Sequence, residues 1–248
     1  EDEATWAFLD EVAFSQVRQL VGLDEVKVAV SSAAPIPAEL IAWYRAIGVP
    51  LSEVYGMSES TGLMAWEPYR VKPGTVGRAF PGTDLFIADD GEICIRGGQV
   101  FRGYLDDPEK TAEALDPDGT LHSGDIGHMD ANGYYYITGR IKDIVIRGGE
   151  NISPKEVEDF IGHMEGVQDI QLVGVPSKKY GEQPAAFIIR KPGSDITETD
   201  VEDFCRNKIA WFKIPKYIHF MDSYPQTASG KIQKYKLREL AAELWPDA

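Results

Sequence analysis

Two dipeptides that favour tight β-turns constrain the middle of this chain. Asp90-Gly91 lies between the apolar runs of LFIADDGEICIRG, and Asn132-Gly133 lies in the same way within HMDANGYYYITG. Asx-Gly pairs flanked by apolar residues are the strongest short-range indication of a β-hairpin, because the tight turns they form need positive φ angles. We therefore predict a β-rich region over residues 71–139.

The preceding residues, 1–70, alternate helical and strand-like patterns. VKVAV and LSEVYG are short apolar runs of strand type, and PAELIAWYRAIG between them begins with Pro and ends at Gly48 as a helix would. A first helix is predicted from apolar residues at helical spacing, namely Phe8, Leu9, Val12, Val17 and Leu20. Alternating helices and buried strands predict part of a parallel α/β layer.

Residues 140–248 have the pattern of a small α+β domain. We predict a capping box of Ser153 with Glu156 at the start of one helix, and Thr199 with Glu202 at the start of another. The apolar face of the first helix would comprise Val157, Phe160, Ile161 and Met164. Three runs, IQLVGV, AAFIIR and YIHFM, are typical of strands.

Composition excludes several classes of function. The chain has 248 residues, 43% of them hydrophobic, which is enough for a globular core. Its net charge of −15 would repel a nucleic-acid backbone. No apolar run approaches the roughly 18 residues of a membrane span, and the first residues lack the pattern of a signal peptide. Cys94 and Cys205 match neither a disulfide framework nor a metal-ligand spacing, so we expect core cysteines in a cytoplasmic protein.

Four polar or glycine-rich segments follow or join the apolar runs: YGMSESTG at 55–62, HSGDIG at 122–127, GRIKDIVIRGGENISP at 139–154 and TASGKIQKYK at 227–236. Taken singly, each is compatible with a turn, a hairpin loop or a linker. Lys231 in the last segment follows a glycine, but the second glycine and the Ser or Thr of a phosphate-binding P-loop are absent.

Taken in order, the motifs SSAAP, YGMSE, GEICIRG, SGD, GRIKDIVIRGGENISP and TASGKIQK resemble those of the adenylate-forming (ANL) superfamily. This superfamily includes acyl-CoA synthetases, firefly-type luciferases and the adenylation domains of peptide synthetases. The segments RGGENISPKEVEDFI and KIPKYIHFMDSYPQTASGKIQKYKLREL most resemble medium- or long-chain acyl-CoA synthetases, that is, fatty-acid-CoA ligases.

The resemblance implies a fold of two parts. Residues 1–139 would form the end of the AMP-binding N-terminal domain, with an α/β part at 1–70 and a β-rich part at 71–139. Residues 140–248 would form the small mobile α+β C-terminal domain. The family's Ser/Thr/Gly-rich phosphate loop ending in Pro-Lys-Gly does not precede Ser31. We therefore expect this chain to be the C-terminal half of such an enzyme, inactive without its N-terminal half.

The implied reaction has two steps. A fatty-acid carboxylate attacks the α-phosphate of Mg²⁺-ATP to give acyl-AMP and pyrophosphate, and the CoA thiol then displaces AMP. Lys231 would be the catalytic cation on the attacking carboxylate and the α-phosphate, a contact worth about 3 to 4 kcal/mol. Asp125 would accept hydrogen bonds from both ribose hydroxyls, and Arg140 would reach the ribose or a phosphate.

The other residues that the resemblance assigns fall into three groups. The adenine and phosphate contacts would be Ala33, Ala34, Pro35, Tyr55, Gly56, Met57, Ser58 and Glu59. Among them Tyr55 would stack on the base and Glu59 would help to hold Mg²⁺. Lys142 would be the hinge about which the C-terminal domain rotates between the two steps. The CoA contacts would be Gly148, Gly149, Glu150, Lys213 and Lys216. Ser32 stands where many relatives have Gly, which leaves open the backbone geometry at that point.

Other functions remain compatible with the sequence. Within the same superfamily, the alternatives are an amino-acid adenylation domain and an acyl-AMP ligase that does not use CoA. A non-catalytic binding or interaction module is the alternative from another class. The presence of Asp125, Arg140 and Lys231 together favours an enzyme, because a module released from catalysis would not need all three.

Overall fold

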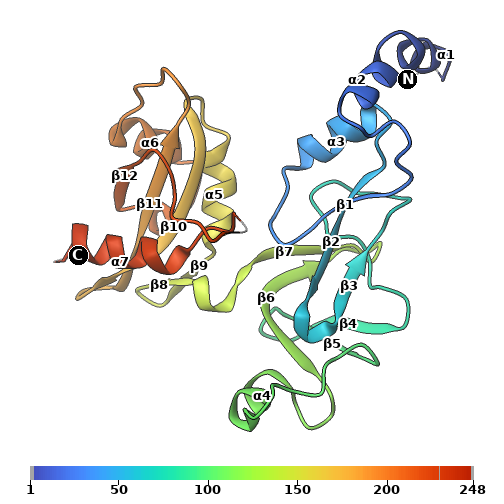
Figure 1. Ribbon diagram of the computed structural model, residues 1–248. Helices are drawn as coiled ribbons and strands as arrows, with labels where there is room; N and C mark the ends of the chain where they lie inside the picture. The colour runs from blue at the N-terminus through green and yellow to red at the C-terminus, as the bar shows by residue number, and fades with distance from the viewer. Residues whose placement is uncertain (1–2, 229, 247–248) are drawn as a thin grey trace. The chain divides into compact units, whose positions relative to one another are not determined.

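The chain forms two compact units in the computed structural model, which describes residues 3–228 and 230–246. Unit 1 comprises Glu1–Ile137 and unit 2 comprises Thr138–Ala248 (Figure 1). The boundary expected between residues 139 and 140 therefore lies two residues after the division between the units. In the part of the chain that the structure describes, no helix has both the length and the apolar character needed to cross a bilayer.

Unit 1 begins with helical turns whose apolar side chains stay exposed. They are α1 (Glu3–Leu9), a π-helical segment (Asp10–Phe14) and α2 (Ser15–Leu20). The predicted helix is therefore confirmed, although its apolar residues are not buried: Phe8 is 62% exposed and Leu20 is 86% exposed.

A three-stranded sheet follows, in the order β1 (Ala29–Ser31), β2 (Leu51–Met57) and β3 (Gly62–Trp66). The pair β1–β2 is parallel, as the α/β pattern predicted, whereas β2–β3 is antiparallel. The helix α3 (Ala38–Ala46) connects β1 to β2. Its residue Ile41 is fully buried with Val49 and Leu51 in the core beside this sheet.

The two predicted hairpins are present in the second sheet of unit 1. This sheet has the order β4 (Thr83–Ile87), β5 (Glu92–Gly97), β6 (Leu121–Met129) and β7 (Tyr135–Arg140), and α4 (Pro108–Ala114) lies between β5 and β6 in the chain. Gly91 joins β4 to β5 with φ 90°, and Gly133 joins β6 to β7 with φ 80°. Each glycine supplies the left-handed conformation that its turn needs.

Unit 2 is an α+β domain built on a five-stranded sheet. Its strands are β8 (Val145–Arg147), β9 (Glu150–Ile152), β10 (Val167–Ser177), β11 (Gly181–Arg190) and β12 (Tyr217–Phe220), and the sheet has the order β10-β11-β8-β9 with β12 also paired to β11. All three predicted strand runs are thereby confirmed.

Helices cover both faces of this sheet. The helices α5 (Pro154–Gly162) and α6 (Glu198–Cys205) bury apolar side chains such as Ile161 and Val201 in one core, and α7 (Lys234–Leu244) buries Leu237 and Ala241 in another. Burial on both faces explains the continuous apolar runs within these strands, LVGV at 172–175 of β10 and AAFII at 185–189 of β11.

Both predicted helix caps in unit 2 were wrong in detail. Ser153 is the N-cap residue of α5 but its side chain makes no capping bond, and its hydroxyl donates to the carbonyl of Thr138 at 2.5 Å. The capping box of α6 is formed by Thr197 with Asp200, two residues before the predicted pair. A local sequence pattern does not reveal which of two nearby Thr residues begins the helix.

Candidate functional site

The predicted ribose ligand, Asp125, lies on β6 where its pairing with β5 is irregular. The register shifts between Glu92 and Cys94 of β5, so that β6 accommodates extra residues at this point. Gly124 allows the bend with a φ of 72°. Such bulges redirect the side chains that follow them, and here the residue that follows is Asp125.

A hydrogen bond links Asp125 to the predicted adenine ligand, Tyr55. The Tyr55 hydroxyl donates to Oδ2 of Asp125 at 2.7 Å, although the two residues are 70 positions apart in the chain. Asp125 is 8% exposed and Tyr55 is 7% exposed. The bond orients the carboxylate in a buried position, where a charge-assisted contact is stronger than in water.

Glu92 supports the bulge that carries Asp125. Its Oε1 accepts the backbone N–H of Gly124 at 2.7 Å, and the residue is only 6% exposed. The sequence analysis did not assign Glu92 to the site. The sequence did contain an indication of its role, because Glu92 is the first residue of the otherwise apolar run EICI. A carboxylate that is buried with such a run needs hydrogen-bond partners.

The residues after β2 form a second group of polar atoms in unit 1. Ser58 and Glu59 lie in a 3-10 turn, Ser58–Ser60, and Ser58 is exposed. Oε1 of Glu59 accepts the hydroxyl of Tyr104 at 2.7 Å, and this bond, with burial second, raises the pKa of Tyr104 to about 12. Tyr104 was not predicted, and it holds the Glu59 carboxylate in place. Oxygen atoms of this kind suit a hard cation such as Mg²⁺.

The predicted adenine loop follows β1. Because β1 and β2 are parallel neighbours, the residues after both strands lie at the same edge of the sheet, where α/β proteins bind ligands. Ala33, Ala34 and Pro35 are all exposed. The question that Ser32 left open is answered, because Ala33 and not Ser32 has the positive φ, at 71°. A left-handed alanine costs about 1 kcal/mol or more.

In unit 2, Lys231 ends a tight turn and is exposed. The backbone N–H of Thr227 donates to the Lys231 carbonyl at 2.9 Å, and the Lys231 N–H donates to Oγ1 of Thr227 at 3.0 Å. A bridge between Gln226 and Ile232 closes the turn. Among the described residues, none forms an ion pair with the Lys231 ammonium, so the geometry leaves this charge available to a ligand.

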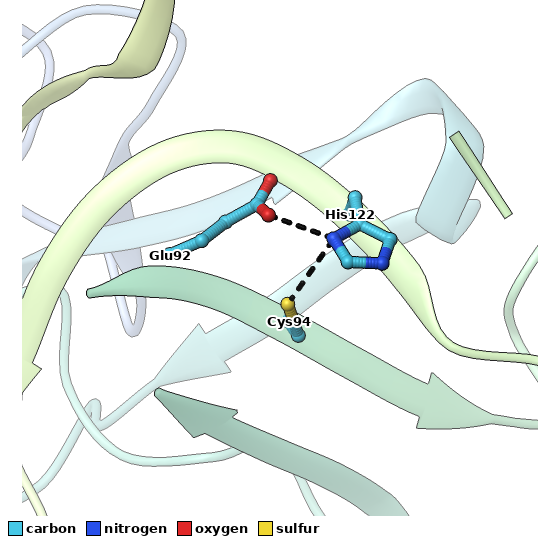
Figure 2. Close-up of side chains that lie close together, drawn as sticks. All are labelled: Glu92, Cys94 and His122. Atoms are coloured by element: carbon cyan, nitrogen blue, oxygen red, sulfur yellow. Dashed lines mark hydrogen bonds and ion pairs between the residues drawn. The ribbon is translucent and has the colours of Figure 1, made fainter. Parts of the chain in front are cut away.

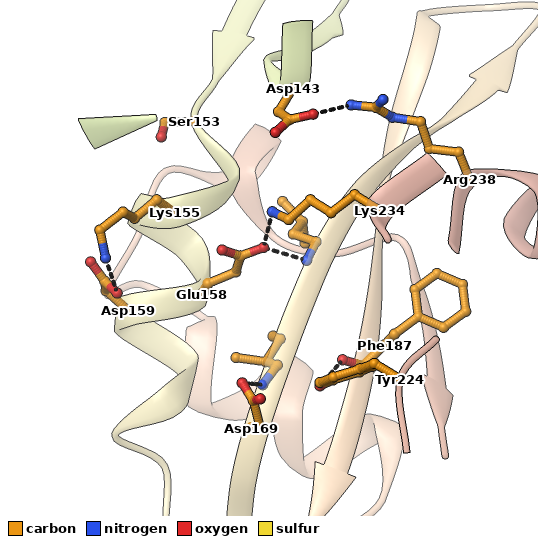
Figure 3. A network of polar contacts seen from close by, with 12 residues as sticks. Asp143, Ser153, Lys155, Glu158, Asp159, Asp169, Phe187, Tyr224, Lys234 and Arg238 are labelled. Carbon is orange, nitrogen blue, oxygen red and sulfur yellow. Dashed lines mark hydrogen bonds and ion pairs between the residues drawn. The ribbon is translucent and has the colours of Figure 1, made fainter. Parts of the chain in front are cut away.

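Side-chain polar contacts hold the helix that follows, α7, to other segments of unit 2 (Figure 3). Oε1 of Glu158 accepts both Nζ of Lys234 and the backbone N–H of Leu172, each at 2.7 Å. Nη2 of Arg238 donates to Oδ1 of Asp143 at 2.7 Å. These contacts tie the helix next to the Lys231 turn to α5, to β10 and to the predicted hinge segment.

The hinge segment is a 3-10 turn, Ile141–Asp143. Lys142 is exposed, and its carbonyl accepts Nη2 of Arg238 at 3.0 Å. Arg140, which precedes the turn and ends β7, is half-buried. The predicted hinge residue therefore has an exposed side chain, and its backbone carbonyl is bonded to α7.

The predicted CoA loop is the two-residue turn of the β8–β9 hairpin. Arg147 pairs with Glu150 across this turn, and Gly148 and Gly149 have φ angles of 60° and 91°. A turn with both central residues left-handed accounts for the glycine pair without any ligand. The turn is exposed, and a side chain added at Gly149 would meet no atom within 4 Å.

Two of the predicted CoA ligands differ in their surroundings. Nζ of Lys213 forms an ion pair with Glu156 at 2.5 Å, whereas Lys216 is exposed and lines a hollow of about 260 Å³. Arg147, which sequence reasoning missed, lines the same hollow and stacks between Tyr180 and Trp211, 5.4 and 5.2 Å from the ring centroids. Burial lowers the pKa of Arg147, and within the described chain its Nε has no hydrogen-bond partner.

The structure distributes the predicted residues over the two units and shows a direct bond between Tyr55 and Asp125. Unit 1 holds Asp125, Tyr55 and Glu59, with the adenine loop at the edge of the first sheet. Unit 2 holds Arg140, Lys142, the glycine pair and Lys231.

Comparison with protein families matches two segments of the chain. Residues 6–105 match the family of AMP-binding enzymes, and residues 156–231 match the AMP-binding enzyme C-terminal domain. Asp125 and Arg140 lie between the two matched segments, and Lys231 is the last residue of the second.

Curated relatives carry the names of acyl-CoA synthetases and ligases. A putative acyl-CoA synthetase, YngI, of Bacillus subtilis is 40% identical over 240 residues, which are 90% of this chain and 44% of the relative. The mitochondrial medium-chain acyl-CoA ligase ACSF2 of Rattus norvegicus is 43% identical over 201 residues, 75% of this chain and 33% of the relative. The chain spans less than half the length of these two relatives.

Solved structures share the fold. ATP-bound MatB from Rhodopseudomonas palustris matches with a TM-score of 0.83 at 32% identity, over 99% of this chain and 54% of that one. The anthranilate CoA ligase AuaEII in complex with anthranoyl-AMP matches with a TM-score of 0.74 at 32% identity, over 86% of this chain and 44% of that one. The predicted fold class is confirmed, and the chain belongs to the AMP-binding, adenylate-forming family, with acyl-CoA synthetases among its relatives.

Proposed function

We propose that this chain is the C-terminal half of an AMP-forming acyl-CoA ligase that activates a fatty acid. The observation that carries the proposal is the buried Asp125 carboxylate, which Tyr55 orients and a glycine bulge presents. A bidentate acceptor of this kind suits the two ribose hydroxyls of a nucleotide. The fatty-acid substrate is supported by the resemblance to medium-chain and other acyl-CoA ligases.

The residues of unit 1 would bind the nucleotide in the first step. Asp125 would hold the ribose, and Tyr55 would contact the base together with the loop 33–35 at the edge of the first sheet. Glu59, held by Tyr104, would be a ligand for Mg²⁺, and Ser58 would contact phosphate. The cation would neutralise charge on the phosphates, a role that the oxygen donors of these residues fit.

The residues of unit 2 would act on both steps. Lys231 would stabilise the negative charge that gathers as the carboxylate attacks the α-phosphate, because its side chain is exposed and no residue that the structure describes forms an ion pair with its ammonium. Arg140 would contact the ribose or a phosphate, and Lys142 would be the hinge at which unit 2 turns between the steps.

For the second step, the exposed turn of Gly148 and Gly149 would lie against the pantetheine chain of CoA, with Glu150 beside it. The hollow is lined by three cations, Arg147, Arg206 and Lys216, and by one carboxylate, Glu202. This excess of positive charge beside the Trp211 ring suits a phosphate. Lys213 was predicted from the sequence to contact a CoA phosphate. Its ion pair with Glu156 makes it a weaker candidate for that contact than Lys216.

The partner of this chain would be the N-terminal half of the same enzyme. The exposed apolar residues of α1 and α2, including Phe8 and Leu20, form a surface that more polypeptide of the same protein would cover. Without that half the chain would lack a complete acyl pocket and ATP site, and would be inactive alone. A cytoplasmic location stays a prediction from composition.

The test is to join the chain in frame behind the segment that precedes the matched region of the Bacillus subtilis relative. With a fatty acid, the fusion protein should exchange pyrophosphate into ATP and form an acyl-CoA thioester, and the chain alone should do neither. Exchange by the chain alone would contradict the proposal that a half is missing.

Other outcomes distinguish the remaining functions. Exchange that depends on amino acids would identify an adenylation domain. Acyl-AMP formation without thioester would identify an acyl-AMP ligase. A folded fusion protein that binds AMP and exchanges nothing would favour the binding module.

A further inference from the structure

Three side chains with metal-binding atoms meet on one face of the second sheet of unit 1, outside the residues assigned above to catalysis (Figure 2). Glu92 and Cys94 lie on β5, two positions apart and therefore on the same side of the strand. His122 of β6 is the direct cross-strand partner of Cys94. The group comes from two segments 28 residues apart, which is why no linear ligand spacing was visible in the sequence.

The potential ligand atoms are close enough to share one ion. Nδ1 of His122 lies 2.7 Å from Oε2 of Glu92 and 3.7 Å from Sγ of Cys94, and all three atoms lie within 4.8 Å of one another. Tetrahedral Zn²⁺ with bonds of about 2.0–2.3 Å keeps its ligands roughly 3.3–3.7 Å apart. Small side-chain adjustments would therefore be enough to seat the ion.

The side chains of His122 and Glu92 also make hydrogen bonds of the kind that orient metal ligands in proteins. Nε2 of His122 lies 3.1 Å from Oδ2 of Asp116, so with Nδ1 on a metal the other ring nitrogen would donate to a carboxylate. Oε1 of Glu92 is already bonded to the Gly124 N–H, which leaves Oε2 for the ion. Both supports would fix the orientation of their ligands.

Burial divides the group into a closed side and an open side. Cys94 is 1% exposed and Glu92 is 6% exposed, whereas the His122 side chain is 35% exposed. An ion would enter from the His122 side and keep a water molecule there as its fourth ligand.

We propose that Glu92, Cys94 and His122 bind a zinc-type divalent cation. A thiolate and an imidazole select Zn²⁺ over Mg²⁺ or Ca²⁺, which prefer oxygen ligands alone. Binding releases the proton of the Cys94 thiol to solvent and uses the lone pair of Nδ1 of a neutral imidazole, whose single proton then lies on Nε2; an imidazolium would release one further proton to solvent. In the metal-free chain the same atoms form the hydrogen bonds seen in Figure 2.

Co²⁺ titration of the reduced, metal-free chain tests the proposal directly. One equivalent of Co²⁺ should produce the visible absorption of a tetrahedral site and a near-ultraviolet thiolate-to-metal band, and Zn²⁺ should abolish both. Cys94→Ser should remove the thiolate band, and His122→Asn should weaken Co²⁺ binding by at least 10-fold.

Cys205→Ser is the matched control, because Cys205 is also a buried free thiol but lies in unit 2. It should leave both absorption bands unchanged. Circular dichroism establishes whether each variant is folded. As a second measurement that needs no variant, Zn²⁺ should raise the melting temperature of the unaltered chain. Absence of a tetrahedral spectrum with the unaltered chain, or a thiolate band that survives in folded Cys94→Ser, would overturn the proposal.

Discussion

Lys231→Ala should separate catalysis from stability. The turn that carries this lysine is held by backbone atoms of Lys231 and by Thr227, and these bonds do not involve the lysine side chain. The side chain is exposed, and no described residue forms an ion pair with its ammonium. The free energy of unfolding should therefore change by less than about 0.5 kcal/mol, as for other exposed substitutions.

The effect on adenylation should be much larger. Removing one preorganised contact to a developing negative charge costs about 2.7–4 kcal/mol, which corresponds to a rate loss of about 100- to 1000-fold. Lys231→Arg should recover only part of the rate, because a planar guanidinium does not place its charge where the ammonium lies. Lys236→Ala, an exposed lysine on α7 without an assigned role, is the matched control and should change the rate less than about 2-fold.

The assay measures both half-reactions on one preparation of the fusion protein described above. Pyrophosphate exchange reports adenylation, and thioester formation from supplied acyl-adenylate reports the second step. The second step should survive in Lys231→Ala, because the lysine would have left the site by then. An equal loss of both half-reactions, with unchanged thermal unfolding, would refute the assignment of Lys231 to adenylation alone.

Two further predictions concern local structure. Gly149→Leu in the fusion protein should slow thioester formation from acyl-adenylate and leave adenylation unchanged. Gly149→Asn should slow thioester formation less, because Asn tolerates the φ of 91°. Equal slowing by both variants would mean that only the turn conformation matters. Hydrogen bonds from the Lys72 ammonium and from the Tyr134 and Asn132 amides lower the pKa of Asp130 to about 2. The ionised carboxylate therefore stabilises the fold at pH values above its unfolded pKa of about 3.9, and this contribution is lost as pH falls toward 2. Asp130→Asn should therefore lower the melting temperature of the chain at pH 7 and converge with the unaltered chain on acidification; a pH-independent difference would contradict this.

Much of the local structure was predictable because its cause lies within a few residues. The turns at Gly91 and Gly133 need the positive φ angles that these glycines have, and strands such as β2, β5, β10 and β11 follow from apolar runs. The family motifs also led to the prediction of Asp125 and Lys231 as site residues, since a motif is a local pattern, and these two assignments stay predictions. The chemical role assigned to each of these residues comes from the resemblance to the family, because the sequence itself shows no contact that would indicate it.

Only the tertiary structure decided which groups meet. The Tyr55–Asp125 bond spans 70 residues, and the Glu92–Gly124 contact depends on a register shift between two strands. The Ser153 hydroxyl was predicted to cap a helix, yet in the fold it donates to the carbonyl of Thr138, 15 residues earlier in the chain. Strand register and long-range packing are set by the free energy of the whole unit, so a short segment read by itself does not contain them.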